Sequence, residues 1–427
     1  MLLTLFLVLA VLLILGAPIA YAIGLSSLSY LALSGNTNLL MVLPQKLFQG
    51  VDSFVLLSIP FYLLAGELMN ATGITIRLIQ FFTVLIGHLR GALAYVNVVS
   101  SILFAGISGT ATADAAAIGG VIIPAMKKEG YTPEFSAALT SAAATIGPII
   151  PPSMVMILYA VFANESVAAL FAAGIVPGLL MGLFLIAAIW LQARKGTLPD
   201  PKPRSTMTEI GTGFRDAVLA LIMPLIILGG LLGGVFTATE AAVVAVVYAL
   251  FLGVFIYRSL SWTRFVGALR SSAIMTGSLL FIASTGALFA WIMASEQVPA
   301  KVADIMLSIS DNPLVFLLLV NVMLLIIGTF MDTLAALIIL VPVLLPIANN
   351  LGIDPVQFGV VIGFNLIQGL ITPPLGIVLF ISAQIAGVRF ERVVRALIPF
   401  LICNLLTLVL ISLFPVLTLQ LPAWLGY

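Results

Sequence analysis

The chain has 427 residues, of which 62% are hydrophobic and 8% carry a charge, and its mean hydropathy is +1.27. A soluble domain carries about 25% charged residues, so the composition predicts a polytopic membrane protein built of helices, embedded in a lipid bilayer, with no large soluble domain. The net charge of +1 argues against nucleic acid as a partner, while a single cysteine and a single histidine exclude a disulfide framework and argue against a histidine-based metal site.

The first 35 residues form one apolar segment with an ambiguous course. As a single straight helix they would extend about 50 Å, well beyond the thickness of a membrane. Gly16-Ala17-Pro18 predicts either a kink or a tight helical hairpin. The sequence leaves both open.

Segment 93–126 is broken at mid-length, at Ser108–Thr112. Half-helices of roughly 15 residues are too short to span a bilayer, so a re-entrant helical hairpin is expected. Its tip, Ser108-Gly109-Thr110-Ala111-Thr112-Ala113-Asp114, offers oxygens for a hard cation and helix N-terminal amides for an anion. Thr112 and Asp114 are also ordinary N-cap residues, so a structural role for either one stays open.

Segment 132–163 is interrupted by Gly147-Pro148-Ile149-Ile150-Pro151-Pro152, with Thr145 before the interruption and Ser153 after it. Consecutive prolines remove amide donors and disfavour helix in the preceding residue. The break frees backbone carbonyls at bilayer depth, which is tolerated where the backbone is buried in protein or lines a polar cavity. A discontinuous helix is therefore predicted.

Residues 193–216 are the least hydrophobic stretch and predict a short cytoplasmic linker. Thr237-Ala238-Thr239-Glu240 beyond it matches a capping box, which favours a structural role for Glu240. The membrane helices expected after the linker are 217–235, 239–257 and 272–294.

The glycines and prolines of the first hairpin and broken helix recur 222 positions later without a gap. The first set is Gly106, Pro124, Gly130, Pro133, Gly147, Pro151 and Pro152, and the second is Gly328, Pro346, Gly352, Pro355, Gly369, Pro373 and Pro374. The chain is therefore predicted to contain two copies of one unit, repeat one at 1–192 and repeat two at 217–427. Paired copies interrupted by Gly and Pro in a very apolar chain are typical of secondary transporters.

The second hairpin, 313–350, has the tip Gly328-Thr329-Phe330-Met331-Asp332-Thr333. An ionised carboxylate near the bilayer centre costs about 2.5–3.5 kcal/mol on insertion scales. Ser or Asn would cap a helix as well, so a sodium-site or gating role is favoured for Asp332 over simple capping.

The second broken helix, 355–386, is interrupted by Gly369-Leu370-Ile371-Thr372-Pro373-Pro374 and followed by Gly376. Asn365 and Gln368 lie just before this break and are candidate ligands, with an interhelical hydrogen bond as the alternative. The candidate sodium ligands across both repeats are Ser108, Asp114, Gly328, Asp332 and Thr372.

Lysines and arginines fall into four groups, which the positive-inside rule places in the cytoplasm. They flank the first hairpin, occupy the linker, lie between the helices 239–257 and 272–294, and precede the last helix. Hairpin 93–126 then begins and ends inside, whereas hairpin 313–350 begins and ends outside. The repeats are therefore predicted to be inverted, with their four breaks converging near the midplane.

Five runs in order resemble the large membrane subunit of TRAP (tripartite ATP-independent periplasmic) transporters over essentially the whole chain. They are Ser108–Asp114, Ile123–Gly130, Gly147–Ser153, Phe236–Glu240 and Thr372–Gly376. The resemblance implies an elevator-type importer in the bacterial inner membrane that uses sodium to carry a small organic acid such as a C4-dicarboxylate or sialic acid. It also implies two partners: a small membrane subunit of about four helices and a periplasmic substrate-binding protein. Val378 stands where many members carry Asn, which leaves the substrate class open.

Other function classes find less support. The chain has no Walker A run, no HExxH and no Gly-x-Ser-x-Gly, so neither an ATP-driven pump within this chain nor an enzyme is expected. A membrane enzyme would have to rely on Asp114 with Asp332. A channel and a stand-alone sodium/organic-anion symporter remain alternatives, although inverted, broken repeats fit alternating access better than a pore.

Overall fold

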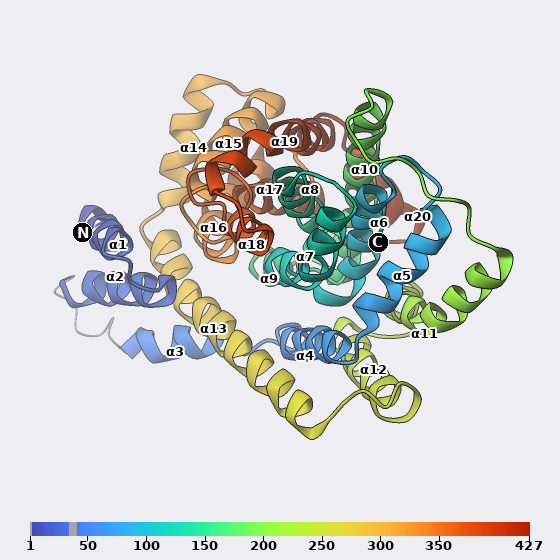
Figure 1. The fold of residues 1–427 in the computed structure, drawn as a ribbon. Helices are drawn as coiled ribbons and strands as arrows, with labels where there is room; N and C mark the ends of the chain where they lie inside the picture. The colour runs from blue at the N-terminus through green and yellow to red at the C-terminus, as the bar shows by residue number, and fades with distance from the viewer. Residues whose placement is uncertain (1, 34–40) are drawn as a thin grey trace.

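The computed structural model describes residues 2–33 and 41–427, and within these ranges it contains helices and no strands (Figure 1). Residues 1, 34 and 35 of the predicted N-terminal segment lie outside the described residues. Six of the described helices are long and apolar enough to cross a membrane. The predicted class, an all-helical membrane protein, is thereby confirmed.

The N-terminal segment folds as a tight helical hairpin. Helices α1 (Leu2–Ile14) and α2 (Ile19–Leu33) pack against each other. Between them Gly16 adopts a left-handed conformation (φ +77°), and the backbone amide of Ala17 donates to the Leu12 carbonyl. Glycine adopts this conformation without steric cost, which explains why the chain turns here.

The outer helices lie along the lower and right-hand edges of the molecule as drawn in Figure 1. The longest, α13 (Trp262–Ser295), packs against α2, α3 and α4. Helices α4 and α5 are bent by 64° relative to each other. The others in this group are α3 (Val42–Gln49), α4 (Ser58–Ala71), α5 (Ile74–Ile86), α11 (Met207–Leu232), α12 (Ala238–Phe251) and the π-helical turn η2 (Leu252–Ile256).

Two of these helices begin with capping boxes. The Glu240 carboxylate accepts from the Thr237 backbone amide while the Thr237 hydroxyl accepts in return, so the predicted structural role of Glu240 is confirmed. The same reciprocal pair, Thr206 with Glu209, starts α11 at Met207. The predicted linker, 193–216, is therefore too long at its C-terminal end, because its last residues belong to α11.

Repeat one contributes a helical hairpin, a broken helix and one long helix. The hairpin helices pack on each other, and nine residues separate the end of α8 from the start of α9, so the predicted interruption is present. The helices are α6 (Ala92–Ser108), α7 (Ala111–Lys128), α8 (Pro133–Ala144), α9 (Met154–Ala163) and α10 (Val167–Arg194).

The hairpin and broken helix of the predicted repeat two follow the same order with the same spacing. Helices α16 and α17 begin 222 residues after α7 and α8, and each break contains a cis proline, at Pro151-Pro152 and at Pro373-Pro374. The helices are α14 (Val298–Ile309), α15 (Pro313–Gly328), α16 (Thr333–Asn350), α17 (Pro355–Gly369), α18 (Ile377–Ala386), α19 (Phe390–Leu413) and α20 (Val416–Trp424).

The two repeats interlock at the centre of the molecule, where α7, α8, α9, α17 and α18 lie in Figure 1. Helix α18 packs on α7 and α8 of the other repeat, and α9 packs on α16 and α17. Each broken helix therefore ends against the hairpin of the opposite repeat. This exchange brings all four backbone breaks into one region.

Candidate functional site

The tips of both hairpins face a common cavity of about 280 Å³. Tip one contributes Gly109 to Thr112, and tip two contributes Asp332 and Thr333. The breaks add Pro148 and Leu370, and α13 closes one side. The apolar part of the lining comprises Ala111, Met154, Val155, Met275, Leu279, Ile282, Leu334, Ile367 and Ile377.

Tip one is shaped by a glycine that no other residue could replace easily. Gly109 has φ +64°, and a Cβ added there would stand 2.5 Å from the Pro152 carbonyl oxygen. This close approach presses the tip against the first break. Thr110 then caps α7, its hydroxyl accepting from the Ala113 amide at 3.4 Å. The α7 N-terminus consequently opens onto the cavity.

Asp114 lies behind tip one, fully buried in the first turns of α7. One of its carboxylate oxygens accepts from the Ser108 hydroxyl, and the other has no partner among the described residues. A Cβ added at Gly147 would overlap this second oxygen. Because Thr110 is the cap, Asp114 is free of that role, and burying a carboxylate without compensation is costly.

Two of the predicted residues thus meet beside the first break, where Asp114 packs against Gly147. The Ser108 hydroxyl and the Asp114 carboxylate are hard oxygen donors, which suit a cation such as sodium. Within residues 2–33 and 41–427, no three His, Cys, Asp or Glu side chains are placed so that they could hold a metal ion together. A cation bound here would depend on hydroxyl and carbonyl oxygens beside one carboxylate.

Tip two is built differently. The Asp332 carboxylate caps α16 by accepting from the Leu334 amide at 3.0 Å, and the Thr333 hydroxyl donates to the Leu366 carbonyl at 3.3 Å. Gly328 and Gly369 meet backbone to backbone, so a Cβ at Gly369 would overlap the Gly328 carbonyl. A small pocket of about 40 Å³ beside them is lined by Asp332, Thr329 and Gly376 among others. Asp332 therefore borders both cavities.

The two carboxylates are not equivalent in the repeat. Asp332 corresponds to Thr110 at the 222-residue spacing, and both are N-caps. Asp114 corresponds to Ala336. Each predicted repeat therefore carries one acid near its hairpin tip, fully buried at Asp114 and half-buried at Asp332. The two acids lie one turn apart along the hairpin helix, so the two halves cannot bind ions with identical ligands.

The remaining predicted residues of the first break stabilise its backbone conformation. Ser153 caps α9, accepting from the Met156 amide at 3.2 Å and donating to the Pro148 carbonyl. The Thr145 hydroxyl donates to the Ala142 carbonyl at 2.7 Å. Neither these two nor Pro151 and Pro152 line the cavity. They hold the unwound segment in shape.

In the second break, Thr372 donates to the Gln368 carbonyl at 2.7 Å and lines neither cavity, and neither do Pro373 and Pro374. The Asn365 amide donates to the side-chain oxygen of Asn321 at 2.8 Å. Helices α15 and α17 are thereby joined by an interhelical hydrogen bond.

Asn404 of α19, which the sequence analysis did not single out, links the two breaks. Its fully buried amide donates to Gln368 Oε1 at 2.9 Å and to Thr145 Oγ1 at 3.3 Å. Its own carbonyl oxygen has no partner in the described part of the chain. One side chain thus connects the end of α8 to the end of α17. An isolated Asn in an apolar run was the only signal available in the sequence.

Comparison with known proteins assigns the family. The family model described as "Tripartite ATP-independent periplasmic transporter, DctM component" matches residues 6–417. The sialic acid TRAP transporter large permease protein SiaM of Vibrio cholerae is 40% identical over 96% of both chains. The C4-dicarboxylate TRAP transporter large permease protein DctM of Pseudomonas aeruginosa is 41% identical over 93% of this chain and 94% of its own.

A solved structure shows the same fold at low sequence identity. The YdaH transporter of Alcanivorax borkumensis superposes with a TM-score of 0.64 at 15% identity, covering 92% of this chain and 90% of that one. At this identity the likeness concerns the fold alone. The family match across nearly the whole sequence shows that this chain belongs to the DctM family of TRAP transporter membrane components.

Proposed function

We propose that this chain is the large subunit of a sodium-coupled secondary importer that carries a small organic acid across the bacterial inner membrane. The observation that carries the proposal is the cavity between the two hairpin tips, because both repeats contribute to it. A site at the interface of two broken repeats is the arrangement expected for alternating access.

Sodium is the coupling ion that suits the oxygens present. The candidate ligands are Ser108 and Asp114 behind tip one, and Gly328 and Asp332 at tip two. Thr372 stays a candidate, because its hydroxyl donates to the Gln368 carbonyl and its oxygen can still accept a cation, although it lines neither cavity. Two ions, one for each repeat, are expected.

The substrate is an anion held without basic side chains. No Lys or Arg lines the cavity among the described residues, but the N-terminus of α7 opens onto it. Helix N-terminal amides carry partial positive charge and bind anions. At the α16 N-terminus Asp332 already offsets that charge, so a cation beside it would be needed before an anion could approach.

The substrate class follows from relatives rather than from any one residue. Relatives are named for sialic acid, C4-dicarboxylates and 2,3-diketo-L-gulonate. Val378 is fully buried and does not line the cavity. We therefore assign a small organic acid, with sialic acid and C4-dicarboxylates as the first candidates to assay.

The proposed mechanism is an elevator. Repeat one and repeat two are inverted around the cavity, hairpins 93–126 and 313–350 enter from opposite faces, and the segment before α11 is cytoplasmic. The hairpins and broken helices would move against the outer helices, which a small subunit of about four helices would brace. A periplasmic substrate-binding protein would deliver the acid. Support comes from the tripartite family and from the separation of outer and central helices in Figure 1.

Reconstitution tests the proposal. Proteoliposomes containing the chain and its small subunit, supplied with the binding protein, should accumulate labelled sialic acid or succinate only under an inward sodium gradient. Replacing sodium with potassium should abolish accumulation. Robust uptake by the purified chain alone would contradict the need for two partner proteins and indicate a stand-alone symporter. Uptake that never exceeds equilibrium would indicate a channel.

A further inference from the structure

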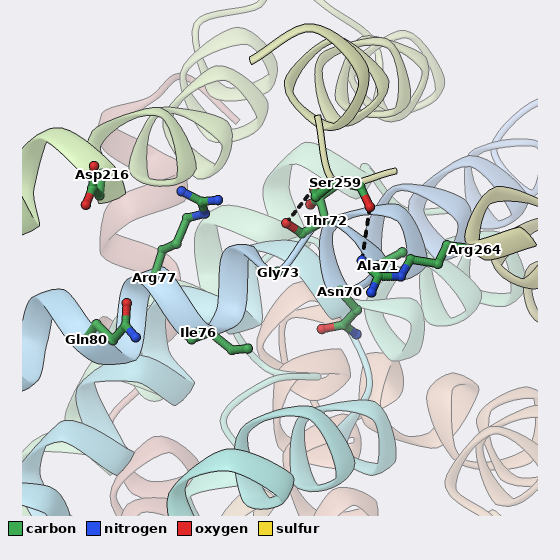
Figure 2. A pocket seen from close by; sticks show the side chains of 10 residues that line it. All are labelled: Asn70, Ala71, Thr72, Gly73, Ile76, Arg77, Gln80, Asp216, Ser259 and Arg264. Carbon is green, nitrogen blue, oxygen red and sulfur yellow. Dashed lines mark hydrogen bonds between the residues drawn. The ribbon is translucent and has the colours of Figure 1, made fainter. Parts of the chain in front are cut away.

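A cavity of about 650 Å³ lies at the bend between α4 and α5, and it shares no lining residue with the cavity between the hairpin tips. The 64° bend is made at Gly73, which has φ +76°. Figure 2 shows Arg77 and Arg264 approaching this cavity from opposite sides. Asn70, Gln80 and Asp216 complete its polar lining.

The loop between η2 and α13 is fixed in place beside the bend. The Ser259 hydroxyl donates to the Thr72 carbonyl at 3.0 Å, and Arg264 Nη1 donates to the Ser259 carbonyl at 3.0 Å (Figure 2). Arg77 stacks on the Tyr257 ring, its Cζ lying 3.9 Å from the ring centroid. Both guanidinium groups are therefore pre-positioned by contacts that leave most of their donors free.

Neither arginine has a carboxylate within 4.0 Å in the described part of the chain. Asp216 lines the cavity without forming an ion pair, so the three charged side chains together carry a charge of +1. Guanidinium groups match the geometry of phosphate oxygens and bind them through paired hydrogen bonds. The cavity is thus suited to a phosphate-bearing anion.

The surroundings of the cavity indicate a lipid rather than a soluble molecule. Trp262 is 77% exposed and Phe255 66% exposed on the segments that flank Ser259. Aromatic residues concentrate at membrane interfaces, and basic pockets between helices on the cytoplasmic side bind anionic head groups. The nearby Arg258 and Arg270 belong to one of the basic groups that the charge pattern assigns to the cytoplasm.

We propose that this cavity binds the head group of an anionic phospholipid of the phosphatidylglycerol type. Arg77 and Arg264 hold the phosphodiester, while the glycerol hydroxyls meet the amide of Gln80 and the carboxylate of Asp216. The acyl chains lie along the exposed apolar surface of η2 and α13. The proposal depends on the chain lying in a membrane, and it is independent of which substrate the transporter carries.

Native mass spectrometry of the full-length chain in mild detergent tests it. Phosphatidylglycerol and phosphatidylethanolamine are titrated separately, and inorganic phosphate is added as a competitor. Wild type should bind phosphatidylglycerol more tightly than phosphatidylethanolamine. Arg77→Gln and Arg264→Gln should each weaken binding about fivefold, the effect expected of one arginine near an anionic lipid surface. Inorganic phosphate should not displace the lipid.

Arg270→Gln is the matched control, because it removes the same charge from the exposed surface of α13 without touching the cavity. An equal loss in this control, or equal binding of the two lipids, would overturn the proposal. Displacement by inorganic phosphate would do the same by indicating a site for soluble phosphate. If the Gln variants misfold, Arg→Lys variants at the same two positions are tested instead, and gel filtration checks their folding. They should lose part of the lipid affinity, because lysine cannot form the paired hydrogen bonds that a guanidinium makes to phosphate.

Discussion

Replacing Asp114 with Asn addresses the sodium site most selectively. The carboxylate is fully buried, and among the described residues only one of its oxygens has a partner, the Ser108 hydroxyl. Asn has nearly the same volume, so the packing against Gly147 is retained. Thr110 caps the helix, so the start of α7 is also unaffected. The substitution removes the charge and little else.

The expected loss can be estimated from the contact removed. Interactions with a charged group are worth about 1.5–3 kcal/mol, and each 1.4 kcal/mol is about a factor of ten in affinity. The half-maximal sodium concentration should therefore rise about 10- to 150-fold. Ser108→Ala should shift it in the same direction by less, because the carboxylate remains.

The assay is the sodium dependence of uptake in proteoliposomes at fixed substrate. Asp311→Asn makes the same chemical change at an exposed position and should leave the sodium dependence unchanged. Asp332→Asn should also weaken sodium binding, although Asn preserves the cap of α16. If Asp114→Asn and Asp332→Asn both keep the wild-type sodium dependence, these residues are structural and the site assignment is wrong.

Three further predictions concern stability. Asn404→Ala removes the amide that joins the two breaks and should lower the free energy of unfolding by about 1–3 kcal/mol. An unchanged melting temperature and transport rate would show that this hydrogen-bonded link is dispensable. Gly369→Ala should destabilise the protein by about 1–3 kcal/mol, because the added Cβ meets the backbone of the opposing hairpin. Gly120→Ala is the control and should not destabilise, because the space around Gly120 is open. Equal melting temperatures of the two variants would contradict the close packing at Gly369. In the loop before α10, burial and the negative charge of Asp354 raise the pKa of Glu165 above its usual value. The stability that Glu165 contributes therefore declines as the pH rises from its pKa in the unfolded chain through its higher pKa in the folded chain. Glu165→Gln should accordingly raise the melting temperature slightly at pH 7 and leave it unchanged near pH 4. An equal rise at both pH values would show that ionisation of Glu165 is not the cause.

The parts of the fold that could be predicted depend on the backbone. Gly109, Gly147 and Gly369 lie where two segments touch too closely for a side chain, and prolines interrupt both broken helices. Few residue types fit at such positions, so glycine and proline there indicate where the helices are interrupted. The positions of the breaks could therefore be predicted without any knowledge of tertiary contacts.

The parts that could not be predicted depend on which apolar faces meet. The three α13 residues that line the cavity look like any lipid-facing residue in the sequence. Asn404 became notable only once α19 was placed between the two breaks. The start of α11 at Met207, within the predicted linker, could have been predicted, because the Thr206 and Glu209 capping box is a local sequence signal. The polar composition of the linker obscured this signal.

The central claim, that a sodium gradient drives accumulation of the acid, is tested most directly by measuring accumulation at equilibrium. The complete transporter, with its small subunit and binding protein, is reconstituted with the membrane potential clamped, and the final substrate ratio across the membrane is measured at a series of sodium ratios. We expect the logarithm of the substrate ratio to rise linearly with the logarithm of the sodium ratio, with a slope of at least two. A substrate ratio of one at every sodium ratio would contradict it.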